Sequence, residues 1–352
     1  MAPFSQARTT ELLYKRRDGT AVYRAHIDVQ WSVFGNPHGG YLLAVIIDAL
    51  SKHQAESNLK PHHPDPAHLM TQFLQGTKPG RAEIHVKVLR IGKSWTNLRA
   101  ELYQEGSLVI TSLALYTVMP SLPLSPTPEP FSTVNQTLLP LTPSPYAPLT
   151  PFVTHPALCD PTPQSDEVHR RWSSNSVFWF LPERIKWAED LGIKARREGK
   201  AEGQQKGESL KLEWGAWCEM TDEGEEADHA TLPFWADMMS SIPELFPPRQ
   251  RVDPHYYPTL SLSLQFHCRL PLPPSSPYLA SPRTVGCYSH GSVIQQGRHE
   301  QLVEVWSAPG PIGEGEVQDE WRKRCVPLLT STQIALSVGT GKMAGRTKPS
   351  KL

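Results

Sequence analysis

Asp237 is the residue whose type and surroundings most directly suggest chemistry. It stands between Trp235-Ala236 and Met238-Met239, in an apolar segment that is expected to form a helix. A carboxylate is expensive to bury unless it is hydrogen-bonded or has a function there. The alternatives are a helix cap or an exposed face. We favour a base or an orienter of water, because that chemistry would give the carboxylate its partners.

A turn in the first part of the chain supplies the next candidates. It reads Phe34-Gly35-Asn36-Pro37-His38-Gly39-Gly40-Tyr41, and its glycines allow a tight bend before an apolar helix. Backbone amides at the start of that helix could stabilise an oxyanion. His38 could donate to a carbonyl in a pocket or could simply complete the turn. We take His38, Gly39 and Gly40 as candidate substrate-binding residues.

The sequence shows no motif for several other chemistries. It has no Gly-x-Ser-x-Gly elbow, no phosphate loop and no dinucleotide fingerprint. The histidines between Lys60 and His68 alternate with prolines, which indicates a surface loop rather than a metal site. The five cysteines form no Cys-x-x-Cys pair, and we interpret them as reduced packing residues. We expect neither a metal nor a cofactor.

The elements that must position these residues occur twice along the chain. Each copy has one apolar helix and a run of long alternating strands. The first helix includes Leu42 to Leu50 and is apolar nearly all round, which marks it as buried. The second is expected between about Leu232 and Leu245. Strands grouped around one helix per copy favour an α+β fold over a doubly wound sheet.

Period-two alternation of apolar residues predicts the strands. In the first copy a strand at 21–30 precedes the helix, and four more follow it: Leu69–Thr77, Ile84–Val88, Leu98–Leu102 and Ser107–Val118. In the second copy Ser176–Phe180 and Leu210–Glu219 precede the helix. The strands expected after it are Thr259–Leu270, Thr284–Gln295, Glu300–Ser307 and Arg324–Val338.

Composition divides the chain into two units and their connections. The stretch 120–165 is rich in Pro, Ser and Thr, and it is expected to be a linker because proline lacks the amide donor that a sheet needs. The N-terminal unit is then 1–119 and the C-terminal unit 166–339. A charged insertion at 188–207 is expected as a solvated loop, and 340–352 as a loose tail.

Charge and hydropathy argue against two broad classes of function. The 352 residues include 35 basic and 35 acidic side chains, so no basic excess is available for gripping nucleic acid. No apolar run is long enough for a membrane span, and the first residues lack the pattern of a signal peptide. We expect an intracellular protein with no nucleic-acid partner and no membrane span.

The order of elements resembles the hotdog fold, in which a curved antiparallel sheet wraps a long central helix. The chain is most similar to the double-hotdog acyl-CoA thioesterases of the bacterial type II group and to their fungal thioesterase-like relatives. The resemblance rests on the stretch Phe34–Asp48 with its Gly-Gly-Tyr, on Thr71-Gln72-Phe73 and on Val88-Leu89-Arg90-Ile91-Gly92-Lys93. It covers nearly the whole chain and implies two curved antiparallel sheets, each wrapping a central helix.

In that family an Asp, a Thr and a Gln of the second half hold the attacking water. The resemblance assigns these roles to Asp237 on the second helix, Thr259 at the start of a strand, and Gln333 on the last strand. The family often has one residue between the Thr that precedes this Gln and the Gln itself, and here none intervenes. Single-hotdog thioesterases carry an acidic residue on the first helix. Asp48 lies about 100° around the helix from that direction, and we interpret it as structural.

The internal repeat tests this assignment. When Gln72-Phe73 is laid over Gln265-Phe266, Thr259 falls on Pro66. When Thr111-Ser112 is laid over Thr330-Ser331, Gln333 falls on Ala114. The first copy therefore lacks two of the three polar groups, so a site of this type is expected in the second copy only. The first copy would then act as a structural partner that closes the pocket.

The resemblance implies an acyl-CoA thioesterase that hydrolyses fatty acyl-CoA to a free fatty acid and CoA without a covalent intermediate. Two alternatives stay open. One is a non-catalytic acyl-CoA-binding or scaffold protein on the same fold. The other is a different acyl-CoA enzyme such as a hydratase, although no Asp/His pair can be placed convincingly on one copy. A homo-oligomer is a further possibility, because members of the family often assemble.

The C-terminal residues carry a different kind of signal. Ser350, Lys351 and Leu352 form the Ser-Lys-Leu address that a peroxisomal import receptor reads. Acyl-CoA metabolism is a main activity of that organelle, so this prediction agrees with the proposed chemistry. We expect a peroxisomal protein, and a cytoplasmic one if the signal is not used.

Overall fold

The structure is a computed structural model that describes residues 2–33, 35–56, 62–119, 122, 139–142, 144–162, 184–205, 209–247, 250 and 255–339. The first half of the molecule is the described part of 2–119, and the second half is the described part of 184–339. The expected strand Ser176–Phe180 and the tail 340–352 lie outside the described residues.

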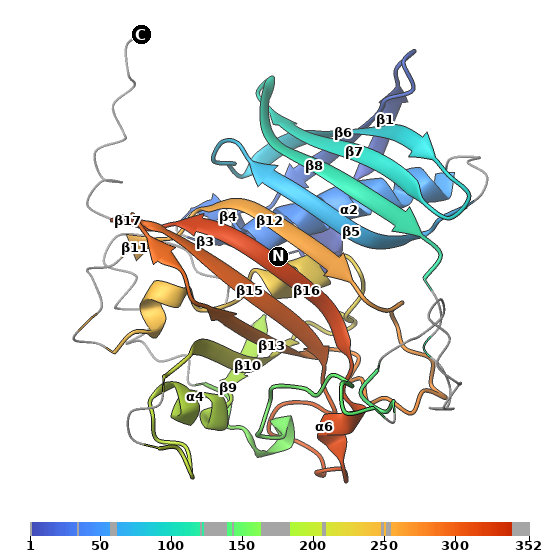
Figure 1. Ribbon diagram of the computed structural model, residues 1–352. Coiled ribbons are helices and arrows are strands. Elements are labelled where there is room, and N and C mark those ends of the chain that lie inside the picture. Colours follow the sequence, from blue (N-terminus) through green and yellow to red (C-terminus); the bar gives the residue numbers. More distant parts are fainter. Residues whose placement is uncertain are drawn as a thin grey trace.

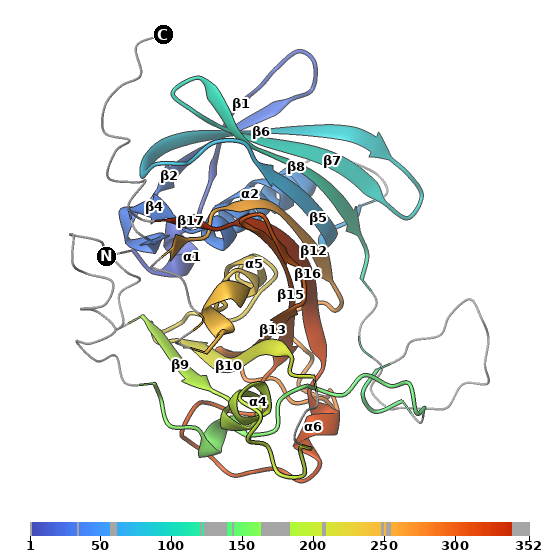
Figure 2. The same cartoon turned by 60° about the vertical axis from the view of Figure 1, so that its left-hand side comes forward.

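Most strands belong to one continuous antiparallel sheet of 13 strands (Figures 1 and 2). The first half contributes β1 (Glu11–Lys15), β2 (Ala21–Ile27), β5 (Asp65–Phe73), β6 (Gly80–Ile91), β7 (Thr96–Gln104) and β8 (Ser107–Thr117). The second half contributes β9 (Ile185–Glu189), β10 (Leu212–Met220), β12 (Thr259–Phe266), β13 (Thr284–Gly291), β14 (Ile294–Gln295), β15 (Arg298–Ser307) and β16 (Pro327–Leu336).

The strand order shows how the halves are joined. It runs β1-β2-β6-β7-β8-β5 and continues directly as β12-β16-β15-β13-β10-β9, with β14 beside β15. The second half therefore repeats the first in reverse order outward from the β5–β12 pair. The two curved antiparallel sheets that the resemblance implied form one continuous sheet, because the edge strands β5 and β12 hydrogen-bond to each other from Ser261↔Gln72 to Gln265↔His68. Pairing removes two exposed sheet edges.

The ladder registers bear out the internal repeat residue by residue. Leu69 lies opposite Ala114, and Leu262 lies opposite Gln333. Both β5 and β12 have an irregularity in their pairing shortly before these residues. It lies between Pro66 and His68 in β5 and between Thr259 and Ser261 in β12. The overlay of Pro66 on Thr259 and of Ala114 on Gln333 thus holds in the backbone pairing.

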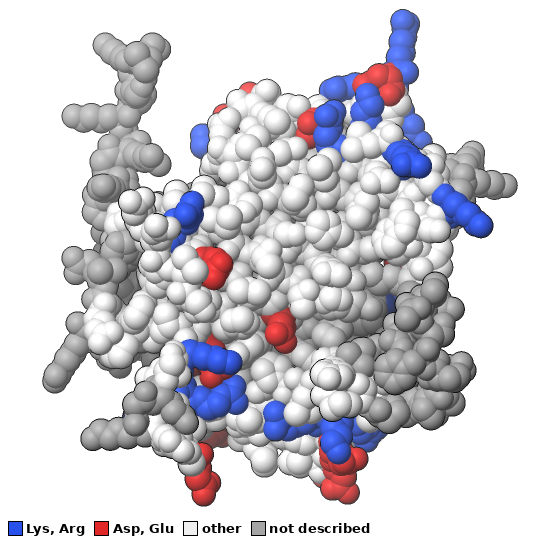
Figure 3. Space-filling view, viewed as in Figure 1, with Lys and Arg blue, Asp and Glu red and all other residues white. Residues whose placement is uncertain are grey.

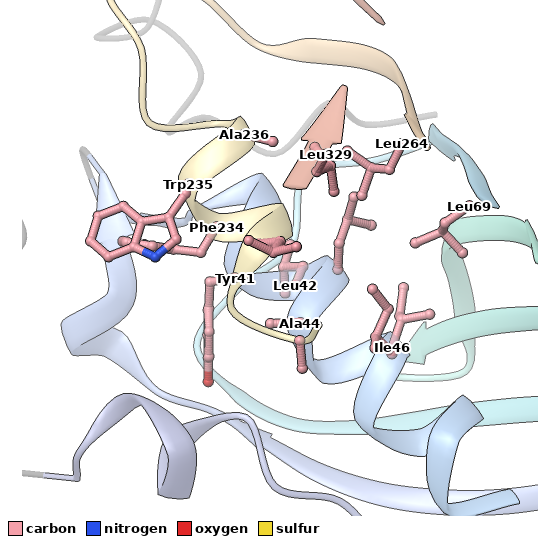
Figure 4. Packing of buried hydrophobic residues seen from close by; sticks show 14 of the residues in the cluster. Tyr41, Leu42, Ala44, Ile46, Leu69, Phe234, Trp235, Ala236, Leu264 and Leu329 are labelled. Atoms are coloured by element: carbon pink, nitrogen blue, oxygen red, sulfur yellow. The ribbon is translucent and has the colours of Figure 1, made fainter. Parts of the chain in front are cut away.

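Helices α2 (Gly39–Glu56) and α5 (Leu232–Ala236) lie on the concave face of the sheet and contact each other (Figure 2). α2 is buried over most of its length, as its all-round apolar sequence predicted. Figure 4 shows Leu42 and Ala44 of α2 packed with Phe234 of α5 and Leu264 and Leu329 of the sheet. This cluster is the core that sets the two helices against each other.

The second helix is much shorter than expected. α5 ends at Ala236, and a separate 3-10 helix, η3 (Ile242–Leu245), follows after a turn. Pro243 lies in the first turn of η3, where its missing amide donor costs no hydrogen bond within the helix. Asp237 is consequently not inside a helix but caps the C-terminal end of α5.

The charged insertion 188–207 also differs from its expected loop. It contains the end of β9 and helix α4 (Leu191–Arg197), which is capped by Asp190 through hydrogen bonds from the Gly192 and Ile193 amides. Ile193 is buried, and Arg196 forms an ion pair with Glu213 of β10. A charged segment is thus folded onto the sheet because its charges find partners there.

Part of the expected linker packs on the second half as well. Phe152 is fully buried and stacks on Trp217, with ring centroids 4.1 Å apart. The 3-10 helix η2 (Pro156–Leu158) and helix α6 (Trp321–Arg324) lie in the same region, near α4. These segments cover the convex face of the sheet at the β10 end, where Gly286 leaves room for the Phe152 ring.

The remaining described elements are short. They are α1 (Phe4–Ala7), η1 (Val29–Trp31), the pair β3 (Ser32–Val33) and β4 (Asn36–Pro37), and the pair β11 (His255–Tyr256) and β17 (Val338–Gly339). None of the helices in the described ranges is long and apolar enough to cross a bilayer.

The convex face over the central strands carries few charges (Figure 3). Strand alternation explains its composition, since Leu262 and Leu264 of β12 point to the helices and are buried. Ser263 and Gln265 of the same strand line a hollow on the opposite face together with His68 of β5. This hollow is therefore separated from the helices by the sheet itself.

Candidate active site

Asp237 lies where the two halves meet. One of its carboxylate oxygens, Oδ2, accepts a hydrogen bond from the backbone amide of Gly40 at 2.8 Å. The other, Oδ1, accepts one from Nε2 of Gln333 at 3.2 Å. The side chain is 8% exposed. A helix start from the first half and a strand from the second half thus both bind the carboxylate.

Thr259 and Gln333 stand on neighbouring strands, β12 and β16. The Nε2 group of Gln333 donates to Oγ1 of Thr259 as well as to Asp237. Gln333 is 5% exposed, and its Oε1 atom has no hydrogen-bond partner among the described residues. The structure therefore brings together the three residues to which the sequence assigned the water. It also leaves one buried amide oxygen at that place with acceptor capacity.

The His38 side chain contacts both the main chain and the side chain of the same aspartate. Its Nε2 lies 3.0 Å from the Asp237 carbonyl oxygen and 3.4 Å from the carboxylate Oδ2. A carbonyl oxygen can only accept, so Nε2 donates in this contact. The ring also packs edge-on against Phe234, with centroids 5.0 Å apart. His38 therefore anchors the turn that carries Asp237.

Gly39 and Gly40 are required by the close approach of α2 to α5. A methyl carbon added at Gly40 would lie 2.2 Å from the Pro233 carbonyl oxygen and 2.7 Å from the Phe234 Cα. One added at Gly39 would lie 2.7 Å from Oδ2 of Asp237. The Gly40 amide is bound to Asp237, whereas the Gly39 amide makes no hydrogen bond among the described residues. Of the two, Gly39 has the amide that remains available.

Burial dominates the electrostatics of Asp237. Desolvation raises the pKa of its carboxyl group, and His38, the Gly40 amide and Gln333 oppose this by stabilising the charged form. The start of α2 adds the positive end of an 18-residue helix dipole beside the carboxylate. The result is a carboxylate of increased basicity that still has partners for its negative charge, as a general base requires.

Tyr256 is a neighbour that sequence reasoning did not identify. It lies on β11, three residues before Thr259, and burial raises the pKa of its hydroxyl group with a further contribution from the Asp237 charge. Its only sequence signal is that nearness to Thr259, which is too weak to single out a tyrosine. The short β11–β17 pair places it at the site.

The other sequence candidates lie elsewhere. Asp48 accepts hydrogen bonds from the backbone and side chain of Thr10 and forms an ion pair with Lys52 at 2.9 Å. It thereby fastens the N-terminal segment to α2, which is a structural role. His63 bonds to Thr96, and His68 bonds to Ser263 on the convex face. All five cysteines are buried and free.

Comparison with known proteins places the chain in a family. Residues 27–117 match the N-terminal domain of acyl-CoA thioesterases, and residues 156–315 match their C-terminal domain. The chain therefore belongs to this acyl-CoA thioesterase family. The C-terminal match begins inside the segment that composition assigned to the linker, which agrees with the packing of η2 on the second half.

Solved structures show the same fold along nearly the whole chain. An acyl-CoA thioesterase II of Mycobacterium marinum is 10% identical and has a TM-score of 0.57, with 96% of this chain and 99% of that chain covered. A hotdog-fold protein of unknown function from Alicyclobacillus acidocaldarius is 16% identical with a TM-score of 0.62, covering 95% and 97%. At these identities the likeness concerns the fold alone.

A curated relative is similar over a shorter stretch. The Ustilagic acid biosynthesis cluster protein orf2 of Mycosarcoma maydis is 40% identical over 92 residues. The match spans 26% of this chain and 23% of the relative, so less than a quarter of that protein's length is matched.

Proposed function

We propose that this protein is an acyl-CoA thioesterase that hydrolyses fatty acyl-CoA to a free fatty acid and CoA. The observation that carries the proposal is the hydrogen-bonded set of Asp237, Thr259 and Gln333, in which the Gln333 amide joins the other two side chains. Family membership supplies the reaction class, and this geometry supplies the groups that the reaction needs. We read the architecture as two hotdog units joined through β5 and β12.

Asp237 activates the attacking water in this mechanism. The carboxylate, made more basic by burial, accepts a proton as water oxygen attacks the thioester carbonyl carbon. The free acceptor Oε1 of Gln333 and the hydroxyl of Thr259 hold the water in line. When the tetrahedral intermediate collapses, the carbon–sulfur bond breaks, CoA leaves as the thiol after taking up the proton, and the fatty acid is released. No enzyme side chain is acylated.

The developing oxyanion needs hydrogen-bond donors near the carbonyl. The amide of Gly39, at the start of α2, is suited to this task, because the neighbouring Gly40 amide already serves Asp237. His38 supports the arrangement indirectly by holding the Asp237 carbonyl. In this scheme the first half contributes to catalysis through the start of its helix.

The same site can be tested for the two alternatives. Purified full-length protein is incubated with saturated acyl-CoAs of several chain lengths, and free CoA is measured with a thiol reagent. Release of CoA and fatty acid in equal amounts is the expected result. Tight binding of acyl-CoA with no release would instead support a non-catalytic binding protein. Conversion of an enoyl-CoA to a hydroxyacyl-CoA without thiol release would support a hydratase.

The address at Ser350, Lys351 and Leu352 lies outside the described residues, and we propose peroxisomal import from its sequence alone. A fluorescent fusion at the N-terminus should collect in peroxisomes, and removal of Leu352 should leave it in the cytoplasm. An unchanged distribution after that removal would contradict the proposal. Homo-oligomer formation likewise stays a prediction, which light scattering of the purified protein measures.

A further inference from the structure

Gln301 is a buried polar residue that the water-holding set does not include. It lies on β15, is 1% exposed, and stands directly opposite Gln333 of β16 in the ladder. Its Nε2 group donates to the carbonyl oxygen of Ser240 at 2.8 Å and to Oγ of Ser289 on β13 at 3.1 Å. A buried donor left unpaired is costly, and these two bonds satisfy the Gln301 amide nitrogen.

Ser240 belongs to the turn that carries Asp237. The first part of this turn is held by backbone hydrogen bonds from Asp237 to Phe234 and from Met238 to Trp235, each 3.2 Å long. Within the described ranges, no backbone–backbone hydrogen bond involves Met239 or Ser240. The Gln301 amide therefore supplies the hydrogen bond that ties the end of the turn to the sheet.

The paired residues Gln301 and Gln333 thus hold Asp237 in two ways. Gln333 binds the Asp237 carboxylate at 3.2 Å, while Gln301 on the adjacent strand binds the main chain three residues later. Because these glutamines face each other across β15 and β16, the turn cannot move away from one without straining its bond to the other. Gln301 is therefore placed to fix the distance between Asp237 and Gln333.

The first half offers an internal comparison for this residue. Leu98 lies opposite Ala114 just as Gln301 lies opposite Gln333, so Leu98 takes the place of Gln301. By the same registers Val86 takes the place of Ser289. The half that carries Asp237 has a hydrogen-bonded polar pair where the other half has two buried aliphatic residues.

We propose that Gln301 is a positioning residue of the hydrolytic site. It holds the Asp237 turn against β15 and so keeps the carboxylate within hydrogen-bonding distance of Gln333. Ser289 accepts the second hydrogen bond of the Gln301 amide, and among the described residues it has no hydrogen bond to the turn. This proposal rests on the proposed thioesterase function. It assigns to Gln301 a role in the rate of hydrolysis rather than in binding of the substrate.

The test compares Gln301→Met, which keeps the length of the side chain but cannot donate, with Ser289→Ala, which leaves the bond to Ser240 in place. For Gln301→Met we expect kcat to fall about 10- to 100-fold with KM within about threefold, because a small misplacement of a catalytic group is costly. Weaker contacts to Gly40 and Gln333 would raise the pKa of Asp237 further, so the acid limb of the kcat profile should move to higher pH. Ser289→Ala should keep kcat within about twofold.

Amide hydrogen exchange provides a readout that does not depend on activity. Exchange in residues 237–241 should be faster in Gln301→Met than in the wild type or in Ser289→Ala. If the wild type hydrolyses no acyl-CoA, the proposed function fails while this exchange comparison still decides the positioning role. Normal exchange, or a kcat equal to that of Ser289→Ala, would overturn the proposal.

Should Gln301→Met fail to fold, Gln301→Leu replaces it, since leucine is the residue that the first half uses at this place. Failure of both variants to fold would make Gln301 a general folding residue, and it would overturn the positioning role as well.

Discussion

The two halves of the sheet share a register but carry different side chains on the concave face. Both joining strands have an irregularity at the same place, and both pair with the next strand in the same way. At matched positions, however, the first half has small or apolar residues and the second has polar ones. The matched pairs are Pro66 and Thr259, Ala114 and Gln333, Leu98 and Gln301, and Val86 and Ser289.

Ser112 stands in the first half where Ser331 stands in the second. Thr71 and Ser112 are both buried and share a hydrogen bond of 2.8 Å. In the second half, Oγ of Ser331 and Oε1 of Gln333 find no partner among the described residues. The Oε1 atom of Gln333 is the acceptor that the proposed mechanism offers to the attacking water. The two halves thus differ in hydrogen bonding at this matched place: the serine is paired in the first half and unpaired, among the described residues, in the second.

The first half is nevertheless more than the structural partner that the sequence predicted. It supplies the start of α2, whose Gly40 amide binds Asp237, and the histidine that holds the aspartate's carbonyl. A site expected in the second copy alone is therefore built from both. The long helix belongs to one half and the carboxylate to the other, so neither half by itself would hold the full arrangement.

The largest effect should come from Asp237→Ala. We expect kcat for acyl-CoA hydrolysis to fall about 10³-fold, the range typical for loss of a general base. Asp48→Asn, which changes the carboxylate of the first-half helix, should keep kcat near that of the wild type. Equal losses in both variants, or undiminished hydrolysis in Asp237→Ala, would show that the halves do not differ in the way proposed.

Gln333→Ala gives the second half the residue that the first half has at that place. It removes a donor to the aspartate and an acceptor for water, and we expect kcat to fall about 10- to 100-fold, as the loss of a buried hydrogen bond of 1–3 kcal/mol implies. Thr332→Ala is the matched control, because Thr332 immediately precedes Gln333 in β16 and its side chain lies on the opposite face of the sheet. A similar loss in the control would mean that disturbance of the strand, not loss of the amide, is being measured.

Gly40→Ala should prevent the close approach of α2 to α5. The added carbon would meet the backbone of α5, and backbone cannot move aside as a side chain can, so we expect a loss of about 1–3 kcal/mol in the free energy of unfolding. Gly76→Ala is the control, because nothing lies within 4 Å of its added carbon. Denaturant unfolding measures both. Equal stabilities would contradict the packing of the two helices described above.

Asp237→Asn should give the smallest effect, a gain in stability at neutral pH. Burial raises the pKa of Asp237 in the folded protein, so its contribution favours folding at low pH and is lost as pH rises through that raised pKa. The gain should therefore shrink on acidification.

Asp18, whose pKa is lowered to about 2, should show the opposite sign, with Asp18→Asn slightly destabilising at neutral pH. Thermal unfolding across pH 3–8 checks both, and a constant difference for Asp237→Asn would refute the raised pKa.

Local patterns in the sequence predicted much of this fold. The all-round apolar helix and the alternation in strands such as Leu260-Ser261-Leu262-Ser263-Leu264 follow from burial of one face, so they can be read from neighbours in the chain. Two local predictions were wrong. The second helix ends at Ala236 rather than near Leu245. The insertion folds as α4 because Arg196 and Ile193 find partners on β10.

The sequence by itself determined which residues alternate, which helix is buried and, through the family resemblance, which three polar residues belong together. Only the tertiary structure decided that Gly40 binds Asp237, a contact between residues 197 positions apart. That contact exists because α2 and α5 pack closely at the glycine pair. Gln301 likewise gained a role only once β15, β16 and the Asp237 turn were in place. Such contacts depend on packing between distant segments, which no local pattern of residue types records.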